Sequence, residues 1–366
     1  MRQIAKRIPE LDAIRGIAII LVLIWHYLVC QLHWKIGILL AFANITWSGV
    51  DLFFVLSGFL IVGILLDNKQ AKNYFQVFYL RRISRIFPLY YLIFFTFLGL
   101  IILAPKNLGW LYQAPLPLWS YLLFVQNFVM GIKNTWGPNW IALTWSLAIE
   151  EQFYLVIPFL IRFFKPIFVI SLFIVLIIFA PILRYILADL GSYVLPFARA
   201  DAILLGGLLA FAVRNKQFLS VLKKYKQLHL ILFLIFLVGA GIISYRFSII
   251  GSVFNHSWLA IFYGLFLLFP IINRESPITQ GLNNQFLIWF GLRSYAIYLF
   301  HQPVSGILHG VLNQANPQIN GFYSGFVTVL ALILTCFLAE LSYKFFEAPI
   351  LKFAHQYKYV KIEKYV

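Results

Sequence analysis

The sequence predicts an all-α polytopic membrane protein with about ten transmembrane helices, and three observations support this. Of the 366 residues, 62% are apolar and only 11% are charged, whereas soluble domains average about 45–50% apolar and about 25% charged residues. At about 20 apolar residues per membrane span, this content suffices for about ten spans and leaves no substantial soluble domain. The basic residues, finally, stand in short clusters between the apolar runs.

Each predicted helix is an apolar run bounded by charged residues or by turn residues. The first run follows the basic segment MRQIAKR, but it is long and lacks an A-x-A-like cleavage site, so we expect a retained helix and not a signal peptide. Basic clusters then separate the second span from the third, the fourth from the fifth and the sixth from the seventh. The expected spans are 16–33, 48–66, 89–104, 141–161, 166–187, 196–213, 228–245, 257–272, 286–311 and 321–343.

The distribution of lysine and arginine predicts the topology. With ten spans and a cytoplasmic N-terminus, 23 of the 29 basic residues fall in cytoplasmic segments and 6 in external ones, as the positive-inside rule requires. We therefore expect both termini in the cytoplasm, one transmembrane domain over residues 1–350 and a short basic cytoplasmic tail over 351–366. The net charge of +17 reflects these clusters, so no nucleic-acid partner is expected.

The cysteines argue against disulfide bonds and against a cysteine-ligated metal site. The chain has 2 cysteines, Cys30 and Cys336, and both lie inside apolar runs. They indicate neither a disulfide framework nor metal-ligand spacing, so no metal site is predicted.

His26 and Arg15 are the first candidates for function, because an ionisable residue near the bilayer centre costs about 2.5–3.5 kcal/mol on insertion scales. His26 lies near the middle of the first span, and Arg15 precedes it by eleven residues. At about 100° per residue both side chains fall on one helical stripe, roughly 16 Å apart. This arrangement suits a long ligand with an anionic head and a reactive end. The alternative for His26 is a structural hydrogen bond between helices.

A second candidate is the arginine cluster in RRISRIFP, residues 81–88. On a helix Arg81 and Arg85 share a face, with Arg82 beside them. Guanidinium groups bind phosphate through paired planar hydrogen bonds. The alternative is a cluster that sets topology or contacts anionic lipid. Lysines would serve that purpose equally well, so the three arginines favour a phosphate site.

The segment TWSLAIEEQFYL, residues 144–155, brings polar side chains into an apolar run. Ser146, Glu150 and Tyr154 fall on one side of the predicted helix. Two adjacent carboxylates are difficult to explain as membrane anchorage, so at least one should face a wet cavity or a cationic partner.

Two further polar residues lie inside predicted spans. Asp51 lies in the outer part of the second span, and its alternative explanation is a helix-start residue near the interface. His301, in SYAIYLFHQP, lies in the ninth span. We include both as candidates for substrate binding.

Seven motifs, taken in their order along the chain, carry a resemblance to a known family. They are LDAIRGIAIILVLIWHY (11–27), GVDLFFVLSGFLI (49–61), RRISRIFPLYY (81–91), WSLAIEEQFYL (145–155), RADAILLGGLLA (199–210), SYAIYLFHQPV (294–304) and SYKFFEAPI (342–350). Together they resemble the acyltransferase-3 family of integral membrane acyltransferases, which includes O-acetylases of lipopolysaccharide, exopolysaccharide, Nod factor and peptidoglycan. The resemblance covers essentially the whole chain.

The resemblance implies an O-acyltransferase of the bacterial cytoplasmic membrane. It would take an acyl group, commonly acetyl, from cytoplasmic acyl-CoA and deliver it to a hydroxyl of a cell-surface glycan or glycolipid. Acyl-CoA is then a donor substrate, and no permanently bound cofactor is expected. By match to the family's motifs, His26, Arg15 and Glu150 would be catalytic residues. Arg81, Arg82 and Arg85 would hold the CoA, and Asp51, Ser146, Tyr154 and His301 are the candidates for substrate binding.

Several alternatives stay open from the sequence. His26 could act as a general base toward the acceptor hydroxyl or as a nucleophile that carries the acyl group. Glu150 could orient His26 or bind the sugar. The chain ends about twenty residues after its last span, so we expect either a separate periplasmic transferase as partner or direct action on the acceptor.

The competing function is a transporter or flippase for a sugar-linked lipid or polysaccharide precursor. Such a protein also needs intramembrane charges and about this many spans. Inverted-repeat transporters often carry corresponding broken segments in their two halves, and we find no such correspondence in this sequence. A purely structural subunit would leave His26 and Glu150 unexplained.

Overall fold

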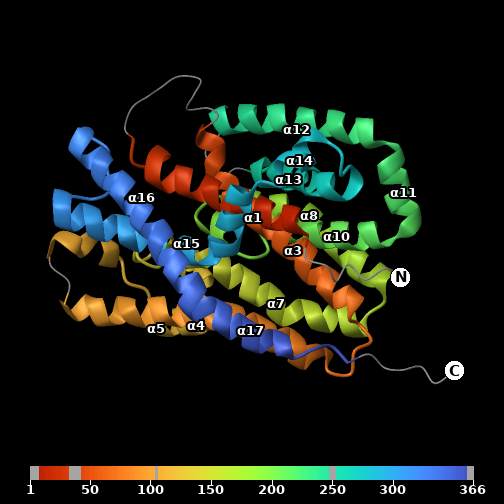
Figure 1. The fold of residues 1–366 in the computed structure, drawn as a ribbon, viewed down its shortest axis with the longest axis horizontal. Coiled ribbons are helices and arrows are strands. Elements are labelled where there is room, and N and C mark those ends of the chain that lie inside the picture. Colours follow the sequence, from red (N-terminus) through yellow and green to blue (C-terminus); the bar gives the residue numbers. More distant parts are fainter. Residues whose placement is uncertain (1–7, 33–42, 104–105, 247–252, 361–366) are drawn as a thin grey trace.

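The computed structural model describes residues 8–32, 43–103, 106–246 and 253–360, and these form a helical bundle (Figure 1). Residues 1–7 and 361–366, which include the predicted cytoplasmic N-terminus and the end of the predicted tail, lie outside the described residues. The long helices are α1 (Pro9–Ile24), α3 (Gly49–Asp67), α4 (Tyr74–Leu103), α7 (Trp145–Phe163), α8 (Pro166–Leu187), α10 (Ala200–Arg214), α12 (Lys226–Arg246), α13 (Asn255–Ile272), α15 (Gln285–Leu308) and α16 (Phe322–Ser342).

Shorter helices extend or connect these long ones. Three are π-helical turns that continue a long helix: η1 (Trp25–Val29) after α1, η5 (His309–Asn313) after α15, and η6 (Tyr343–Glu347) between α16 and α17 (Ala348–Gln356). The others are η2 (Ile45–Ser48), η3 (Lys106–Tyr112), α5 (Leu118–Leu122), α6 (Gln126–Lys133), η4 (Ala142–Thr144), α9 (Gly191–Val194), α11 (Lys216–Lys224) and α14 (Pro277–Gly281).

The structure confirms the all-α polytopic membrane fold, since each of the ten expected spans overlaps a long helix, with bounds that differ by up to fifteen residues. Seven helices are long and apolar enough to cross a membrane, and α10 with α11, bent by 97°, makes an eighth if the pair is one span. The two remaining expected spans are α7, of 19 residues, and α15, of 24 residues. Polar residues such as Glu150 and His301 interrupt the apolar sequence of these two helices. The orientation of the termini stays a prediction.

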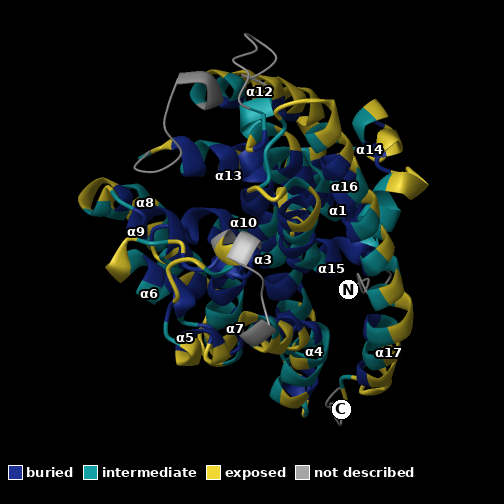
Figure 2. Ribbon diagram, turned by 90° about the vertical axis from the view of Figure 1, so that its left-hand side faces the viewer, coloured by how far each residue is buried: buried dark blue, intermediate teal, exposed yellow. Residues whose placement is uncertain are grey.

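The bundle has a buried centre and exposed flanks (Figure 2). In the most apolar window, 72% of residues are buried in the span that includes α3 and 67% in α13, but only 17% in α8 and in α12. The exposed side chains of α8 and α12 include Ile178 and Val238, as expected of helices that face lipid. The polar candidates therefore belong to the inner helices and not to the flanks.

Glycines allow two pairs of central helices to pack backbone against backbone. A Cβ atom added to Gly16 of α1 would lie 1.9 Å from the carbonyl oxygen of Leu287 in α15, and Gly291 of α15 meets α1 in the same way. A Cβ atom added to Gly58 of α3 would lie 1.8 Å from the carbonyl oxygen of Ile203 in α10. Small residues at such crossings let helices approach closely within a membrane.

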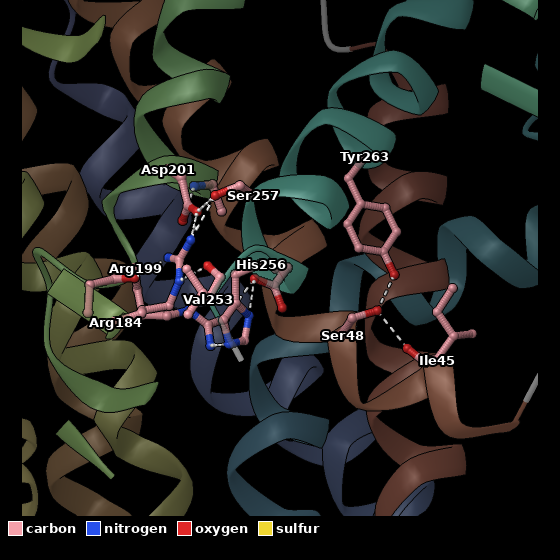
Figure 3. Close-up of polar contacts among 12 residues, drawn as sticks. Ile45, Ser48, Arg184, Arg199, Asp201, Val253, His256, Ser257 and Tyr263 are labelled. Carbon is pink, nitrogen blue, oxygen red and sulfur yellow. Dashed lines mark hydrogen bonds and ion pairs between the residues drawn. The ribbon is translucent and has the colours of Figure 1, made fainter. Parts of the chain in front are cut away.

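Two buried ion pairs join α10 to its neighbours (Figure 3). Arg184 of α8 donates to Asp201 of α10 at 2.8 Å, and Ser257 of α13 donates to the same carboxylate at 2.7 Å. Arg199, directly before α10, donates to Asp51 of α3 at 2.7 Å. All four charged side chains are at most 1% exposed. Breaking a buried pair by removing one partner typically costs about 3–5 kcal/mol, so these contacts fix α10 in the bundle.

One end of the bundle, on the right of Figure 1, gathers several segments predicted to be cytoplasmic. At this end Arg214 of α10 donates to Asp67 of α3 at 2.6 Å. The backbone N–H of Lys72, between α3 and α4, donates to the carbonyl oxygen of Val360 at 2.9 Å. Helix α17 crosses the predicted domain boundary at residue 350, and that boundary stays a prediction.

Candidate active site

Two histidines from different helices lie side by side within the bundle. The ring centroids of His26 and His301 are 4.8 Å apart, edge to face. His26 Nδ1 is 3.0 Å from the carbonyl oxygen of Val22, and His301 Nδ1 is 2.7 Å from that of Tyr298. A carbonyl oxygen only accepts hydrogen bonds, so Nδ1 carries the proton in each neutral ring and Nε2 presents a lone pair. In this tautomer Nε2 is the atom that can act as a general base or nucleophile.

Neighbouring side chains hold this histidine pair in place. The Tyr27 hydroxyl donates to the carbonyl oxygen of His301 at 2.8 Å and lies 2.8 Å from the hydroxyl of Thr335 in α16. Gln31 donates to the carbonyl oxygen of His26 at 3.0 Å. His26 belongs to the π-helical turn η1, a local geometry that is frequent at functional sites.

The histidine pair lines an outer cavity of about 700 Å³, including its open mouth, toward the predicted external ends of α1 and α15. The other lining side chains supply amides, hydroxyls and a thiol, and among the described residues that line the cavity none carries a full charge. The outer cavity is lined by His26, Tyr27, Cys30, Gln31, His301, Gln302, Ser305, Asn316 and Pro317.

A separate inner cavity, of about 810 Å³ including its open mouth, brings most of the predicted residues together. Helices α1, α3, α4, α7 and α15 contribute its walls. Six of the ten candidates line it, namely Arg15, Arg82, Arg85, Ser146, Glu150 and Tyr154. The lining thus holds three arginines against one carboxylate, Glu150, among apolar and hydroxyl-bearing side chains. This excess of positive charge matches an anionic ligand with a long, weakly polar arm.

A short hydrogen-bond chain organises the wall of the inner cavity. Tyr154 donates to Glu150 at 3.0 Å, and its hydroxyl is 2.5 Å from that of Ser57 in α3. The guanidinium of Arg82 lies over the Tyr154 ring, 6.0 Å from its centroid. Glu150 thus lines the inner cavity, whereas His26 lines the outer one.

Tyr298 forms the wall between the two cavities. Its side chain lines the inner cavity, and its carbonyl oxygen accepts the Nδ1 proton of His301, which lines the outer one. The Tyr298 hydroxyl donates to the carbonyl oxygen of Leu143 at 2.8 Å and lies 2.7 Å from the hydroxyl of Ser146. Its ring centroid is 5.8 Å from that of His301, so Tyr298 adjoins both the inner cavity and the histidine pair.

Arg81 and Asp51 lie against neither cavity. Arg81 donates to the carbonyl oxygen of Tyr357 at 2.7 Å, and its guanidinium lies 5.3 Å from the Tyr359 ring centroid. Burial raises the pKa of the Tyr359 hydroxyl, which therefore stays uncharged beside the arginine. The carboxylate of Asp51 is fully buried against Arg199. The ligand-binding roles of Arg81 and Asp51 stay predictions. Their positions do not favour these roles, because neither side chain lines either cavity.

Several side chains of the site were not identified from the sequence. Helical periodicity could have indicated Tyr298, three residues before His301. Gln31 follows His26 by five residues, which is not an α-helical same-face spacing, and it bonds to the His26 carbonyl oxygen through the π-helical turn η1. No signal in the sequence distinguishes Ser57 from an ordinary hydroxyl between helices. Among the described residues, no group of three or more His, Cys, Asp or Glu side chains is placed to hold a metal ion.

Comparison with known proteins identifies several relatives. The O-acetyltransferase OatA of Staphylococcus aureus (strain NCTC 8325 / PS 47) is 29% identical over 371 residues, covering 95% of this chain and 58% of the relative. The putative peptidoglycan O-acetyltransferase YrhL of Bacillus subtilis (strain 168) is 30% identical over 370 residues, covering 94% of this chain and 55% of the relative. The peptidoglycan O-acetyltransferase OatA of Listeria monocytogenes is 29% identical over 388 residues, covering 98% and 58%.

The alignments cover nearly all of this chain but only part of each relative. The chain spans little more than half the length of the curated relatives that it matches. No solved structure matches it significantly. The profile of the acyltransferase-3 family, described as an acyltransferase domain, matches residues 8–340. This match covers nearly the whole helical bundle, including both cavities, and the chain therefore belongs to the acyltransferase-3 family.

Proposed function

We propose that this protein transfers an acetyl group from acetyl-CoA to a hydroxyl of a cell-envelope glycan, across the bacterial cytoplasmic membrane. One observation carries the proposal: Tyr298, which lines the inner cavity with its three arginines, is hydrogen-bonded through its carbonyl oxygen to His301 of the histidine pair in the outer cavity. Such an arrangement lets two substrates reach one reaction centre from opposite faces of the membrane. The names of the relatives, two of them peptidoglycan O-acetyltransferases, favour peptidoglycan as the glycan.

The donor occupies the inner cavity. Arg82 and Arg85 bind phosphate groups of CoA near the predicted cytoplasmic face, and Arg15 adds a third cation. The pantetheine arm then extends past Ser146 toward Tyr298, so that the thioester approaches the histidine pair. Arg81, which is bonded to the C-terminal segment, supports the fold of this entrance and does not contact the donor.

His26 is the general base. Its Nε2 lone pair takes the proton of the acceptor hydroxyl while the oxygen forms a bond to the thioester carbonyl carbon. The carbon–sulfur bond then breaks, and the imidazolium returns the proton to the CoA thiolate. The products are the acetyl ester and CoA, and His26 ends in its starting tautomer. Direct transfer of this kind requires no covalent acyl-histidine.

The test is turnover by the purified protein in lipid nanodiscs. With radiolabelled acetyl-CoA and peptidoglycan fragments, the wild type should release CoA thiol and form an alkali-labile acetyl ester. His26→Ala should abolish both products, whereas His355→Ala, at an exposed histidine of α17, should not. Normal ester formation by His26→Ala would refute the assignment of His26. A flippase would move a lipid-linked sugar without releasing CoA thiol.

A further inference from the structure

The outer cavity contains buried hydrogen-bonding groups without a partner in the protein. His301 is 0% exposed, and its Nε2 has no hydrogen-bond partner. Gln302, the next residue, likewise has a buried Oε1 atom without a partner. Both residues line the outer cavity. Buried polar atoms in folded proteins are nearly always hydrogen-bonded to protein, water or ligand, so an unpaired set at a cavity wall is placed to pair with a molecule that enters the cavity.

The identity of the unpaired atoms specifies the chemistry of that ligand. The Nδ1 proton of His301 is committed to the carbonyl oxygen of Tyr298, so Nε2 of the neutral ring is an acceptor. His26 Nε2 is an acceptor for the same reason. The two imidazoles face one cavity with their ring centroids 4.8 Å apart. A ligand that satisfies both rings must bring two hydrogen-bond donors close together.

We propose that the outer cavity binds an uncharged saccharide unit with two neighbouring hydrogen-bond donors, and that His301 Nε2 accepts the second one. This inference rests on the proposed function. The first donor is the hydroxyl that His26 deprotonates. The second is a hydroxyl or amide N–H beside it on the same sugar. The Oε1 atom of Gln302 is a further acceptor for this donor. His301 is thus a specificity residue that selects and orients the acceptor.

The charge of the cavity excludes the main alternative ligand. A carboxylate or phosphate has no proton to donate to two imidazole acceptors, and it would need a cation in the wall. The outer cavity has none among its described lining residues, while the three arginines line the inner cavity. The two cavities therefore separate an anionic ligand from an uncharged one.

The experiment compares the acceptor methyl β-glucoside with its monodeoxy analogues. The protein in nanodiscs is given acetyl-CoA and each sugar, and kcat/KM for acetyl transfer is measured. For the wild type, the monodeoxy analogue that lacks the second donor should have a kcat/KM lower by about fivefold, the value of one net hydrogen bond. His301→Asn keeps a donor for the Tyr298 carbonyl oxygen and removes the Nε2 acceptor. This variant should lower kcat/KM for methyl β-glucoside and leave kcat/KM for that analogue unchanged. The variant should therefore no longer discriminate between the two sugars.

The control is His229→Asn, at a buried histidine of α12 that bonds to the carbonyl oxygen of Leu265 and lines neither cavity. It should retain the wild-type discrimination. Methyl β-glucuronide, which carries a carboxylate, should be a poor acceptor.

Two results would overturn the inference alone. One is equal transfer by the wild type to all the sugars, including the glucuronide. The other is an equal loss for every sugar in His301→Asn, which would indicate a structural role. If the wild type released no CoA thiol with any sugar or with peptidoglycan fragments, the proposed function itself would fail.

Discussion

The ion pair between Asp51 and Arg199 allows a direct test of whether Asp51 serves stability or substrate binding. Its two side chains are 0% exposed, and their atoms are 2.7 Å apart. His256 also lies close, with Nδ1 at 3.5 Å from the same carboxylate oxygen. Asp51→Leu would leave the Arg199 guanidinium buried without its counter-charge. The sequence suggested substrate binding for Asp51, whereas the structure indicates that it holds α3 to the start of α10.

The expected size of the effect follows from burial. Removing one partner of a buried pair typically costs about 3–5 kcal/mol, because an uncompensated charge stays in the low-dielectric interior. The double variant Asp51→Leu/Arg199→Leu should recover most of this loss, since apolar replacement of a whole buried pair is often neutral. The matched control is Asp67→Leu. Its pair with Arg214 is 35% and 21% exposed on the two side chains, so the loss should be at most about 1 kcal/mol.

The assay is thermal unfolding of the purified protein in one detergent, followed by tryptophan fluorescence, together with steady-state kinetics on whatever fraction remains folded. We expect a large drop in melting temperature for Asp51→Leu, a small one for Asp67→Leu and a substantial recovery in the double variant. The reasoning would be refuted by an Asp51→Leu protein that melts like the wild type but has a raised KM for the acceptor. That result would return Asp51 to substrate binding.

Three further predictions concern packing, the donor site and the wall between the cavities. Gly58→Val should sharply reduce the yield of folded protein on size-exclusion chromatography, because the new side chain meets the α10 backbone. Gly99→Val should not reduce it, since nothing lies within 4 Å of a Cβ atom there. Equal yields of the two variants would contradict the packing of α3 against α10. Arg82→Ala should raise the KM for acetyl-CoA by about tenfold or more, the value of a charge-assisted hydrogen bond, while Arg81→Ala should leave it nearly unchanged; the reverse order would show that Arg81 binds the donor. Tyr298→Ala should raise acetyl-CoA hydrolysis without acceptor several-fold, measured as thiol release, and an unchanged rate would mean that Tyr298 does not separate the cavities.

The membrane fold could be predicted because its main determinants are local. An apolar run bounded by charge forms a spanning helix almost regardless of its neighbours, since every backbone polar group in lipid must be satisfied within the helix. The same logic identified α7 and α15 as spans, although their polar residues make them the least apolar of the long helices. Their polar side chains are explained by the site that they line in the interior of the bundle.

Side-chain partners from distant helices could not be predicted in the same way. Helical spacing paired Arg81 with Arg85. In the structure Arg82 and Arg85 line the inner cavity, whereas Arg81 is hydrogen-bonded to the C-terminal segment. Likewise, nothing around Asp51 indicated an arginine that follows it by 148 residues. Tertiary contact decides whether a charge inside a span binds a ligand or another helix.

The helix pair α1 and α15 shows how backbone packing sets up the chemistry. Gly16 and Gly291 lie at their closest crossing. His26 and His301 each follow their glycine by ten residues, about 15 Å along a helix, and their rings are in contact. The two helices therefore run in the same direction and keep their register from the crossing to the histidine pair. A side chain at either glycine would push the helices apart at one end of this register, so the geometry of the two imidazoles depends on residues that touch no substrate.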